Sequence, residues 1–263
     1  MSCAVITGAT SGIGLEYAMQ LAATGYDIVV VSNRHKDNHR VATELAERYG
    51  VQAEPLYVDL TQADAAEQIY AFVQQRGLKV DVLINNAGML LFSQVVNTAP
   101  QQMERIIALH CTTPTKLCRL FARDMAERGG GHILIMSSIT AWTPYPTISL
   151  YAATKAYLHS FAQSLWYEMR GRGVSITTVY PSAVDTPFYE LSDKMRGLLL
   201  RVGLMLSAPS VARKAWRAMF AGRRRCVPGV ITKIEAVICY LLPAWVLLPI
   251  MKIPSVRRIL ERV

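Results

Sequence analysis

The sequence predicts an α/β fold in which a doubly wound parallel sheet is covered by helices on both faces. Three observations predict it. Short apolar runs alternate with helix-patterned stretches, a glycine-rich loop joins the first run to the first such stretch, and the chain has 263 residues. Apolar runs fit strands buried on both faces, and strands that alternate with helices pair in parallel through right-handed crossovers. The length suits one large domain with a sizeable core.

The elements are expected in a regular order. Six strands are predicted from apolar, β-branched runs near residues 3–7, 27–32, 53–58, 80–84, 132–137 and 174–180. Five helices are predicted between them, at 13–24, 38–49, 62–76, 101–128 and 150–171. In such a sheet ligands bind at the carboxyl ends of the strands, so residues that follow strands are the first candidates for a site.

A glycine-rich loop follows the first predicted strand. It reads Thr7-Gly8-Ala9-Thr10-Ser11-Gly12-Ile13-Gly14 and leads into the first predicted helix. Strand, glycine turn and helix in this order are typical of a dinucleotide site, because backbone amides and a helix N-terminus offer positive potential to a pyrophosphate. The candidate cofactor residues in this loop are Gly8, Thr10, Ser11, Gly12, Ile13 and Gly14.

A tyrosine and a lysine, Tyr151 and Lys155, stand four residues apart in the last long predicted helix. Side chains at i and i+4 share one helix face, so the ammonium charge can favour the phenolate form of the tyrosine. That pairing would make Tyr151 a usable general acid or base. Ser138 precedes the pair by thirteen residues and falls at the end of the fifth predicted strand.

These residues resemble the short-chain dehydrogenase/reductase family, and the resemblance extends from residue 1 to about residue 187. It implies a Rossmann-type fold and NAD(P)-dependent oxidoreductase chemistry. In that family the tyrosine transfers a proton to or from the substrate oxygen, the lysine holds the nicotinamide ribose, and the serine positions the carbonyl. The resemblance assigns these roles to Tyr151, Lys155 and Ser138.

Further matches concern the adenosine half of the cofactor. Asn85-Asn86-Ala87-Gly88 follows the fourth predicted strand, and Asp59-Leu60 follows the third. The resemblance places Asp59, Leu60, Asn86, Ala87 and Gly88 around the cofactor.

Cofactor choice is predicted from the end of the second strand, which reads Ser32-Asn33-Arg34. A carboxylate there would accept hydrogen bonds from the ribose hydroxyls and repel a 2′-phosphate. Its absence, together with Arg34 as a donor to phosphate, favours NADP(H). NAD(H) is the alternative, in which case Arg34 is a solvated loop residue.

One position departs from the family. His110 stands where an asparagine usually helps to hold a water that links the lysine to solvent. Imidazole can donate and accept, so His110 can take this relay role as a further catalytic residue. The alternative is a polar core residue without a kinetic role.

The loop after the sixth strand resembles the family's Pro-Gly-x-x-x-Thr pattern, with Ser182 where glycine is usual. The resemblance implies that Pro181 and Thr186 contact the nicotinamide end of the cofactor. The stretch 188–206 then alternates apolar and basic residues. It is expected to be a mobile helical lid over the substrate, because an apolar lid shields the chemistry from water.

The last third of the chain is strongly basic and partly apolar. From Lys194 onward it holds 14 Lys or Arg against 2 Glu, yet residues 236–251 carry no charge. These sixteen residues are interrupted by two prolines and fall short of the ~20 needed to span a bilayer. Two interpretations stay open: peripheral membrane association through residues 236–258, or packing on the domain or a subunit. Nucleic acid is not expected as a partner, because the cations are interleaved with aliphatic rather than stacking aromatic residues.

These patterns divide the chain into three regions of one domain. Residues 1–187 are the dinucleotide-binding and catalytic core, 188–229 the substrate lid with the last core elements, and 230–263 an apolar, basic extension.

Five scattered cysteines predict reduced thiols, no metal site and a cytoplasmic location, or a peripheral one at the inner face of a membrane. The early first strand argues against a secretory signal. The resemblance implies a homodimer or homotetramer.

The expected function is that of an NADP(H)-dependent oxidoreductase of the short-chain type. It would transfer hydride between nicotinamide and a hydrophobic ketone or secondary alcohol, such as a steroid or a long-chain 3-keto lipid like 3-ketosphinganine. The apolar lid and tail favour this hydrophobic small-molecule substrate. The alternative is an NAD(P)-binding protein without turnover that senses redox state or interacts with a membrane.

Overall fold

The structure, a computed structural model, describes residues 2–144, 148–186 and 192–241. Its centre is a seven-stranded parallel sheet in the order β3-β2-β1-β4-β5-β6-β9. The strands are β1 Cys3–Thr7, β2 Asp27–Ser32, β3 Ala53–Tyr57, β4 Val80–Asn85, β5 Gly131–Met136, β6 Val174–Val179 and β9 Arg225–Cys226. The chain leaves β1 toward β2 on one side and returns to β4 on the other. The predicted doubly wound parallel sheet is therefore confirmed.

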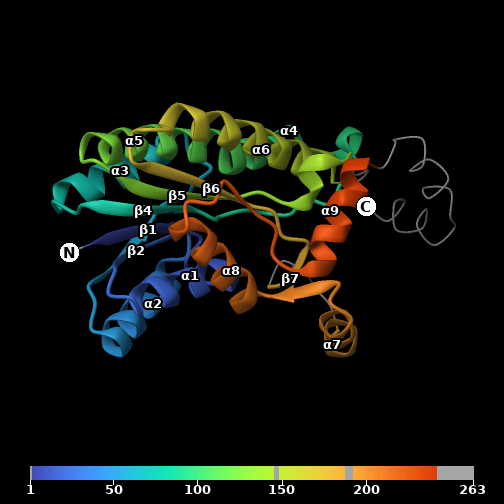
Figure 1. Cartoon of the computed structure of the whole chain (residues 1–263), viewed down its shortest axis with the longest axis horizontal. Helices are drawn as coiled ribbons and strands as arrows, with labels where there is room; N and C mark the ends of the chain where they lie inside the picture. Colours follow the sequence, from blue (N-terminus) through green and yellow to red (C-terminus); the bar gives the residue numbers. More distant parts are fainter. Residues whose placement is uncertain (1, 145–147, 187–191, 242–263) are drawn as a thin grey trace, which may run out of the picture.

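Helices cover both faces of the sheet (Figure 1). One face carries α1 Gly12–Ala22, α2 His35–Tyr49 and α8 Ala208–Phe220, and the other carries α3 Ala65–Gln75, α4 Pro100–Ile107, α5 Thr113–Glu127 and α6 Ser149–Met169. Strand β1 shows why its sequence is apolar throughout, since Val5 packs into one core layer and Ile6 into the other, both fully buried. Burial on both faces is what the uninterrupted apolar runs predict.

The predicted helix at 101–128 is interrupted. It consists of α4, a π-helical turn at Ala108–Thr112, and α5. Pro114 lies in the first turn of α5, where its missing N–H removes one donor from the backbone ladder. The wider π turn accommodates that loss and carries His110, which is 1% exposed.

Several short elements in the last third were not predicted. β7 Ala183–Asp185 pairs in parallel with β8 Met205–Ser207, and β9 extends the main sheet beside β6. Strands of two or three residues are too short to show periodicity. Two helices complete the described chain, α7 Asp193–Arg201 and α9 Val230–Leu241, at the end of the molecule that the strand carboxyl ends face (Figure 1). None of the described helices is long and apolar enough to cross a membrane.

Candidate active site

A cavity of about 520 Å³ lies at the carboxyl ends of the central strands. Eighteen predicted site residues line it: Gly8, Thr10, Ser11, Gly12, Ile13, Ser32, Asn33, Arg34, Asp59, Leu60, Asn86, Ala87, Gly88, Ser138, Tyr151, Lys155, Pro181 and Thr186. The two others, Gly14 and His110, do not line it. Residues far apart in sequence meet here because parallel strands end at one edge.

The glycine loop is shaped by close backbone contacts. Gly8 and Gly12 have φ angles of 68° and 54°, in the left-handed region that glycine adopts without strain. A Cβ added at Gly14 would lie 2.1 Å from the carbonyl oxygen of Gly8, so α1 can approach the loop only because this residue is glycine. A side chain at Gly14 would collide with the loop and with the Asn86 amide, so the cradle that the loop forms at the N-terminus of α1 could not keep its shape.

Asn86 and Thr7 hold that loop against the end of β4. The Thr7 hydroxyl accepts hydrogen bonds from the backbone N–H groups of Asn86 and Ala87, at 3.0 and 3.1 Å. In return the Asn86 side-chain amide donates to the Thr7 carbonyl at 3.0 Å. The amide of Asn86 thus maintains the shape of the cradle.

The end of β2 is fixed by a buried asparagine that the sequence analysis did not identify. Asn38, 1% exposed in the first turn of α2, donates to the carbonyls of Ser32 and Leu56 at 3.0 and 2.9 Å. The Ser32 hydroxyl donates to the Asn38 side-chain oxygen at 2.6 Å and accepts from the Arg34 N–H at 3.1 Å. The Arg34 side chain is exposed at the cavity edge and forms no ion pair with a described residue.

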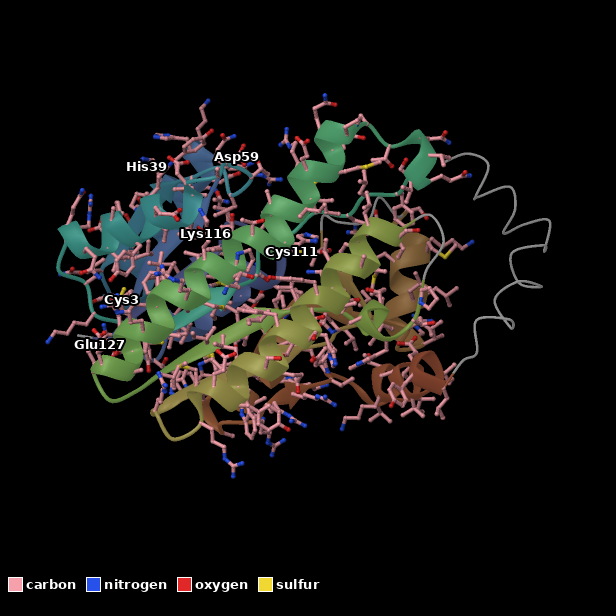
Figure 2. All side chains as sticks on the ribbon, turned by 90° about the horizontal axis from the view of Figure 1, so that it is seen from above. Cys3, His39, Asp59, Cys111, Lys116 and Glu127 are labelled. Carbon is pink, nitrogen blue, oxygen red and sulfur yellow. The ribbon has the colours of Figure 1, made fainter. Side chains whose placement is uncertain are left out.

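Asp59, labelled in Figure 2, follows β3 and is anchored by its own turn. The Thr61 N–H and hydroxyl donate to its carboxylate at 3.0 and 2.9 Å. Burial alone would raise the pKa of Asp59, but these hydrogen bonds and the charge of Arg105 lower it below its usual value. Arg105 of α4 also lines the cavity, which the sequence analysis did not predict.

Lys155 is a buried cation at the centre of the site. Its side chain is 5% exposed, and its Nζ donates to the Met136 carbonyl at 2.9 Å. Burial lowers the pKa of Lys155 to about 8, a shift that Cys111 partly opposes. The Lys155 Nζ lies 5.4 Å from the centre of the Tyr151 ring, so its charge acts on that ring. The Ser137 hydroxyl, which donates to the Lys155 carbonyl at 2.9 Å, ties α6 to the end of β5.

Ser138 presents its hydroxyl to the same cavity. It caps the 3-10 turn Ile139–Trp142, where its oxygen accepts from the Thr140 N–H at 3.2 Å. That contact uses a lone pair and leaves the hydroxyl hydrogen to be donated elsewhere. Ser138 and Tyr151 both line this cavity.

His110 lies behind Tyr151 with both ring nitrogens engaged. Its Nε2 accepts from the Met89 N–H at 3.0 Å, and its Nδ1 lies 2.9 Å from the Thr154 hydroxyl. That hydroxyl donates to the Tyr151 carbonyl at 2.8 Å, so Nδ1 carries the hydrogen and the imidazole is neutral. Burial, followed by the charge of Lys155, holds the pKa of His110 well below its usual range. The relay role stays a prediction.

The loop after β6 is tied to α9. The Ser182 hydroxyl lies 3.0 Å from the hydroxyl of Thr232, which is fully buried in α9. The serine that replaces the usual glycine therefore links Pro181 and its neighbours to the C-terminal helix.

The lid prediction for 188–206 stays untested. Helix α7 lies in this stretch, but none of its residues lines the cavity, and residues 187–191 lie outside the described residues.

Apolar side chains that were not predicted as site residues also line the cavity. They come from the segment after β4, from the turn before α5, and from the segment before α6: Met89, Leu90, Phe92, Leu109 and Ile148. A substrate bound there would meet hydrocarbon around one polar centre, as is usual for small-molecule sites.

The site and fold can be compared with known proteins. A sequence model described as short chain dehydrogenase matches residues 2–197. The very-long-chain 3-oxoacyl-CoA reductase of Bos taurus is 34% identical over 187 residues, which are 70% of this chain and 59% of that protein. The human 17-beta-hydroxysteroid dehydrogenase type 3 is 35% identical over 188 residues, with the same two shares. The chain thus spans about three fifths of the length of these relatives.

Solved structures show the same architecture. A short-chain dehydrogenase from Sphingobium yanoikuyae in complex with NADPH superimposes with a TM-score of 0.79 at 26% identity, over 90% of this chain and 92% of that one. A 7beta-hydroxysteroid dehydrogenase superimposes with a TM-score of 0.83 at 22% identity, over 92% of both chains, which is a likeness of fold alone.

Proposed function

Because the chain belongs to the short-chain dehydrogenase/reductase family of oxidoreductases, we propose that it is an NADP(H)-dependent reductase of hydrophobic ketones. The observation that carries the proposal is that Ser138, Tyr151 and Lys155 line one cavity together with the glycine loop. The glycine loop, which would hold the cofactor, and the side chains that would handle the proton line the same cavity. A reaction that combines hydride transfer with proton transfer requires this arrangement.

The cofactor would be held by the chain's own cradle. The open N-terminus of α1 and the loop around Gly8 and Gly12 suit a pyrophosphate, since a Cβ at Gly14 would destroy the loop. The exposed Arg34 suits a 2′-phosphate and favours NADP(H) over NAD(H). The relative from Sphingobium that binds NADPH supports this choice. When bound, the nicotinamide supplies or accepts the hydride.

Three side chains handle the substrate oxygen and its proton. The Ser138 hydroxyl donates to the substrate oxygen and orients the carbonyl. The Tyr151 hydroxyl gives its proton to that oxygen in the reductive direction and takes it back in the oxidative one. The ammonium of Lys155, unscreened because it is buried, stabilises the phenolate that remains.

The substrate class follows from the apolar wall. Met89, Leu90, Phe92 and Leu109 suit a steroid or a long-chain 3-keto lipid such as 3-ketosphinganine. The relatives named for a very-long-chain 3-oxoacyl-CoA and for a 17-beta-hydroxysteroid point in the same direction. Physiological reduction is favoured if the cofactor is NADPH.

The test is the loss of near-ultraviolet absorbance of NADPH with steroid, long-chain 3-keto and small polar ketones. Turnover is expected with the first two groups only. Tyr151→Phe should lower kcat/KM by at least about 100-fold, the usual contribution of a general acid. The control is Tyr157→Phe on the same helix, because Tyr157 is 42% exposed, does not line the cavity, and has its hydroxyl 2.9 Å from that of Thr115. NADPH binding without turnover of any ketone would favour the redox-sensing alternative.

A second proposal concerns peripheral attachment to a membrane through the C-terminal region. The supporting observation is the exposure of apolar side chains on α9, including Val230 at 74% and Tyr240 at 73%. The region 236–258 predicted for this role is described only as far as residue 241. Apolar side chains on a helix within a basic region suit the interface of an anionic bilayer.

A further inference from the structure

A second cavity, here called the cationic groove, lies outside the candidate active site. It measures about 1170 Å³ and is bounded by α8, the segment around β9, and α9. Five cationic side chains line it: Lys214, Arg217, Arg223, Arg225 and Lys233. No carboxylate is among the described residues of its wall. The groove therefore gathers positive charge from three parts of the last third of the chain.

These cations are not neutralised within the described fold. None of the five forms an ion pair with a described residue, and Arg225 is held by a neutral partner, Gln163, at 3.0 Å. Like charges that converge without counter-charges repel each other, which disfavours the empty groove. An anion in the groove would relieve that repulsion.

Neighbouring groups respond to this positive potential. The pKa of His159, which lines the groove, is lowered by burial and then by the charges of Arg225 and Arg224. Burial raises the pKa of Cys226 to about 11, against the opposing charges of Lys214, Arg223 and Lys233. The field of the cations thus reaches the interior of the groove.

Apolar side chains line the groove as well. They include Trp142, stacked on Tyr180 at 4.5 Å between ring centres, and side chains of α9. Leu241 and Val237, which line the groove, are 68% and 57% exposed. Ile234 and Ile238 add exposed apolar area to the same helix, at 56% and 52%. A small soluble anion would leave this hydrocarbon in water, whereas a lipid interface would cover it.

We propose that the cationic groove binds the anionic head groups of bilayer phospholipids while the apolar side chains of α9 enter the interface. The proposal rests on the proposed membrane attachment and gives it a site. The sequence beyond α9 favours a bilayer over other anions. It is uncharged from 242 to 251 and then carries Lys252, Arg257 and Arg258, which extends the same combination of apolar and cationic residues.

The test is binding of the whole protein to vesicles of phosphatidylcholine with and without half phosphatidylglycerol. The groove variant is Lys214→Gln/Arg217→Gln. The matched control is Arg201→Gln/Arg213→Gln, which removes the same charge from exposed residues of the same region outside the groove. The wild type should bind only the anionic vesicles. The groove variant should bind them about 30-fold more weakly, since each cation near such a surface contributes ~1 kcal/mol.

The other outcomes are distinct. The control pair should lose less than about threefold, and all variants should keep the wild-type melting temperature and turnover without vesicles. If groove and control variants bind alike, the groove assignment fails while membrane attachment stands. If the wild type ignores anionic vesicles, both fail. Release by millimolar inorganic phosphate, beyond that caused by chloride of equal ionic strength, would make the groove a site for soluble phosphate and overturn the proposal. Groove-dependent dimerisation in sedimentation would also overturn it.

Discussion

At the scale of single residues, the burial of Lys155 in the site lowers the stability of the fold. A lysine that is 5% exposed has lost most of its hydration, and its ammonium group donates to the Met136 carbonyl. The folded chain therefore binds the Lys155 proton more weakly than the unfolded chain does. Such a cost is common where a residue is retained for chemistry rather than for stability.

This cost predicts a pH-dependent effect of Lys155→Met. The folded-state pKa is about 8, below the ordinary value of 10.5. Between these values the unfolded chain holds more protons, so the free energy of unfolding of the wild type rises with pH across this window. The Lys155→Met variant lacks this rise. The difference in the free energy of unfolding, variant minus wild type, should therefore fall by about 3 kcal/mol between pH 7 and about pH 10.5.

The measurement is denaturant unfolding of the cofactor-free protein at the two pH values. Lys79→Met, which removes an exposed lysine, controls for the loss of one charge. A difference between wild type and Lys155→Met that does not change with pH would show that the buried lysine keeps its ordinary proton affinity.

The position of a residue at the cavity could be predicted where one short stretch carries both the side chain and its context, and the chemical roles of these residues stay predictions. Ser138, Tyr151 and Lys155 follow a strand or share a helix face, and both relations are readable from spacing. Asn38 and Arg105 could not be predicted in this way. Their roles depend on contacts between elements, from α2 to the end of β3 and from α4 to Asp59, which no local pattern contains.

At the scale of elements, the glycine loop and α1 act as one unit. Gly14 is helical, yet it is the glycine that the packing requires most, because an added Cβ would lie 2.1 Å from the Gly8 oxygen and 2.5 Å from the Asn86 Nδ2. Both contacts are shorter than real Cβ atoms allow, and the nearer one is backbone. Either α1 or the loop would have to move.

Gly14→Ala should therefore weaken both stability and cofactor binding. We expect a loss of about 1–3 kcal/mol in the free energy of unfolding, as for other overpacked sites, and at least tenfold weaker binding of NADPH. Gly197→Ala in α7 is the matched control, because a Cβ there meets nothing within 4 Å. It should be neutral or stabilising by up to about 1 kcal/mol. Equal effects of the two substitutions would contradict the packing argument.

Five helix positions were predicted from periodicity, but the interruption of one of them was not, and neither were α8 and α9. The 101–128 segment keeps helical spacing on both sides of residues 108–112, so the π turn leaves no clear mark in the pattern. Pro114 was the available signal, and it is ambiguous because proline is also common in a first helical turn. The inward placement of His110 depends on that turn.

At the scale of the whole molecule, α9 connects the two cavities. Through Thr232 it touches Ser182, which lines the candidate active site, and through Lys233 and Val237 it lines the cationic groove. The sequence predicted an apolar, basic extension but not this contact, because the partner of Ser182 lies fifty residues away. Only the structure shows what the serine in place of the family glycine contacts.

Thr232→Val tests that connection. In the wild type we expect anionic vesicles to change the Kd of NADPH by about fivefold, the factor that one hydrogen bond of about 1 kcal/mol can transmit. Thr232→Val cannot form the bond, so vesicles should leave its Kd for NADPH nearly unchanged, and the same is expected of Ser182→Ala. NADPH titrations with and without vesicles measure these Kd values. A fivefold change that persists in both variants would exclude this hydrogen bond as the connection.

If the hydrogen bond between Ser182 and Thr232 couples membrane binding to dinucleotide binding, that coupling acts in both directions. Binding free energies around a closed cycle must sum to zero, so the factor by which a membrane alters the affinity for the dinucleotide equals the factor by which the dinucleotide alters the affinity for the membrane. The nicotinamide pool of the cell would then influence how much of the protein resides on a lipid surface, and the lipid surface would influence how much of the protein holds cofactor.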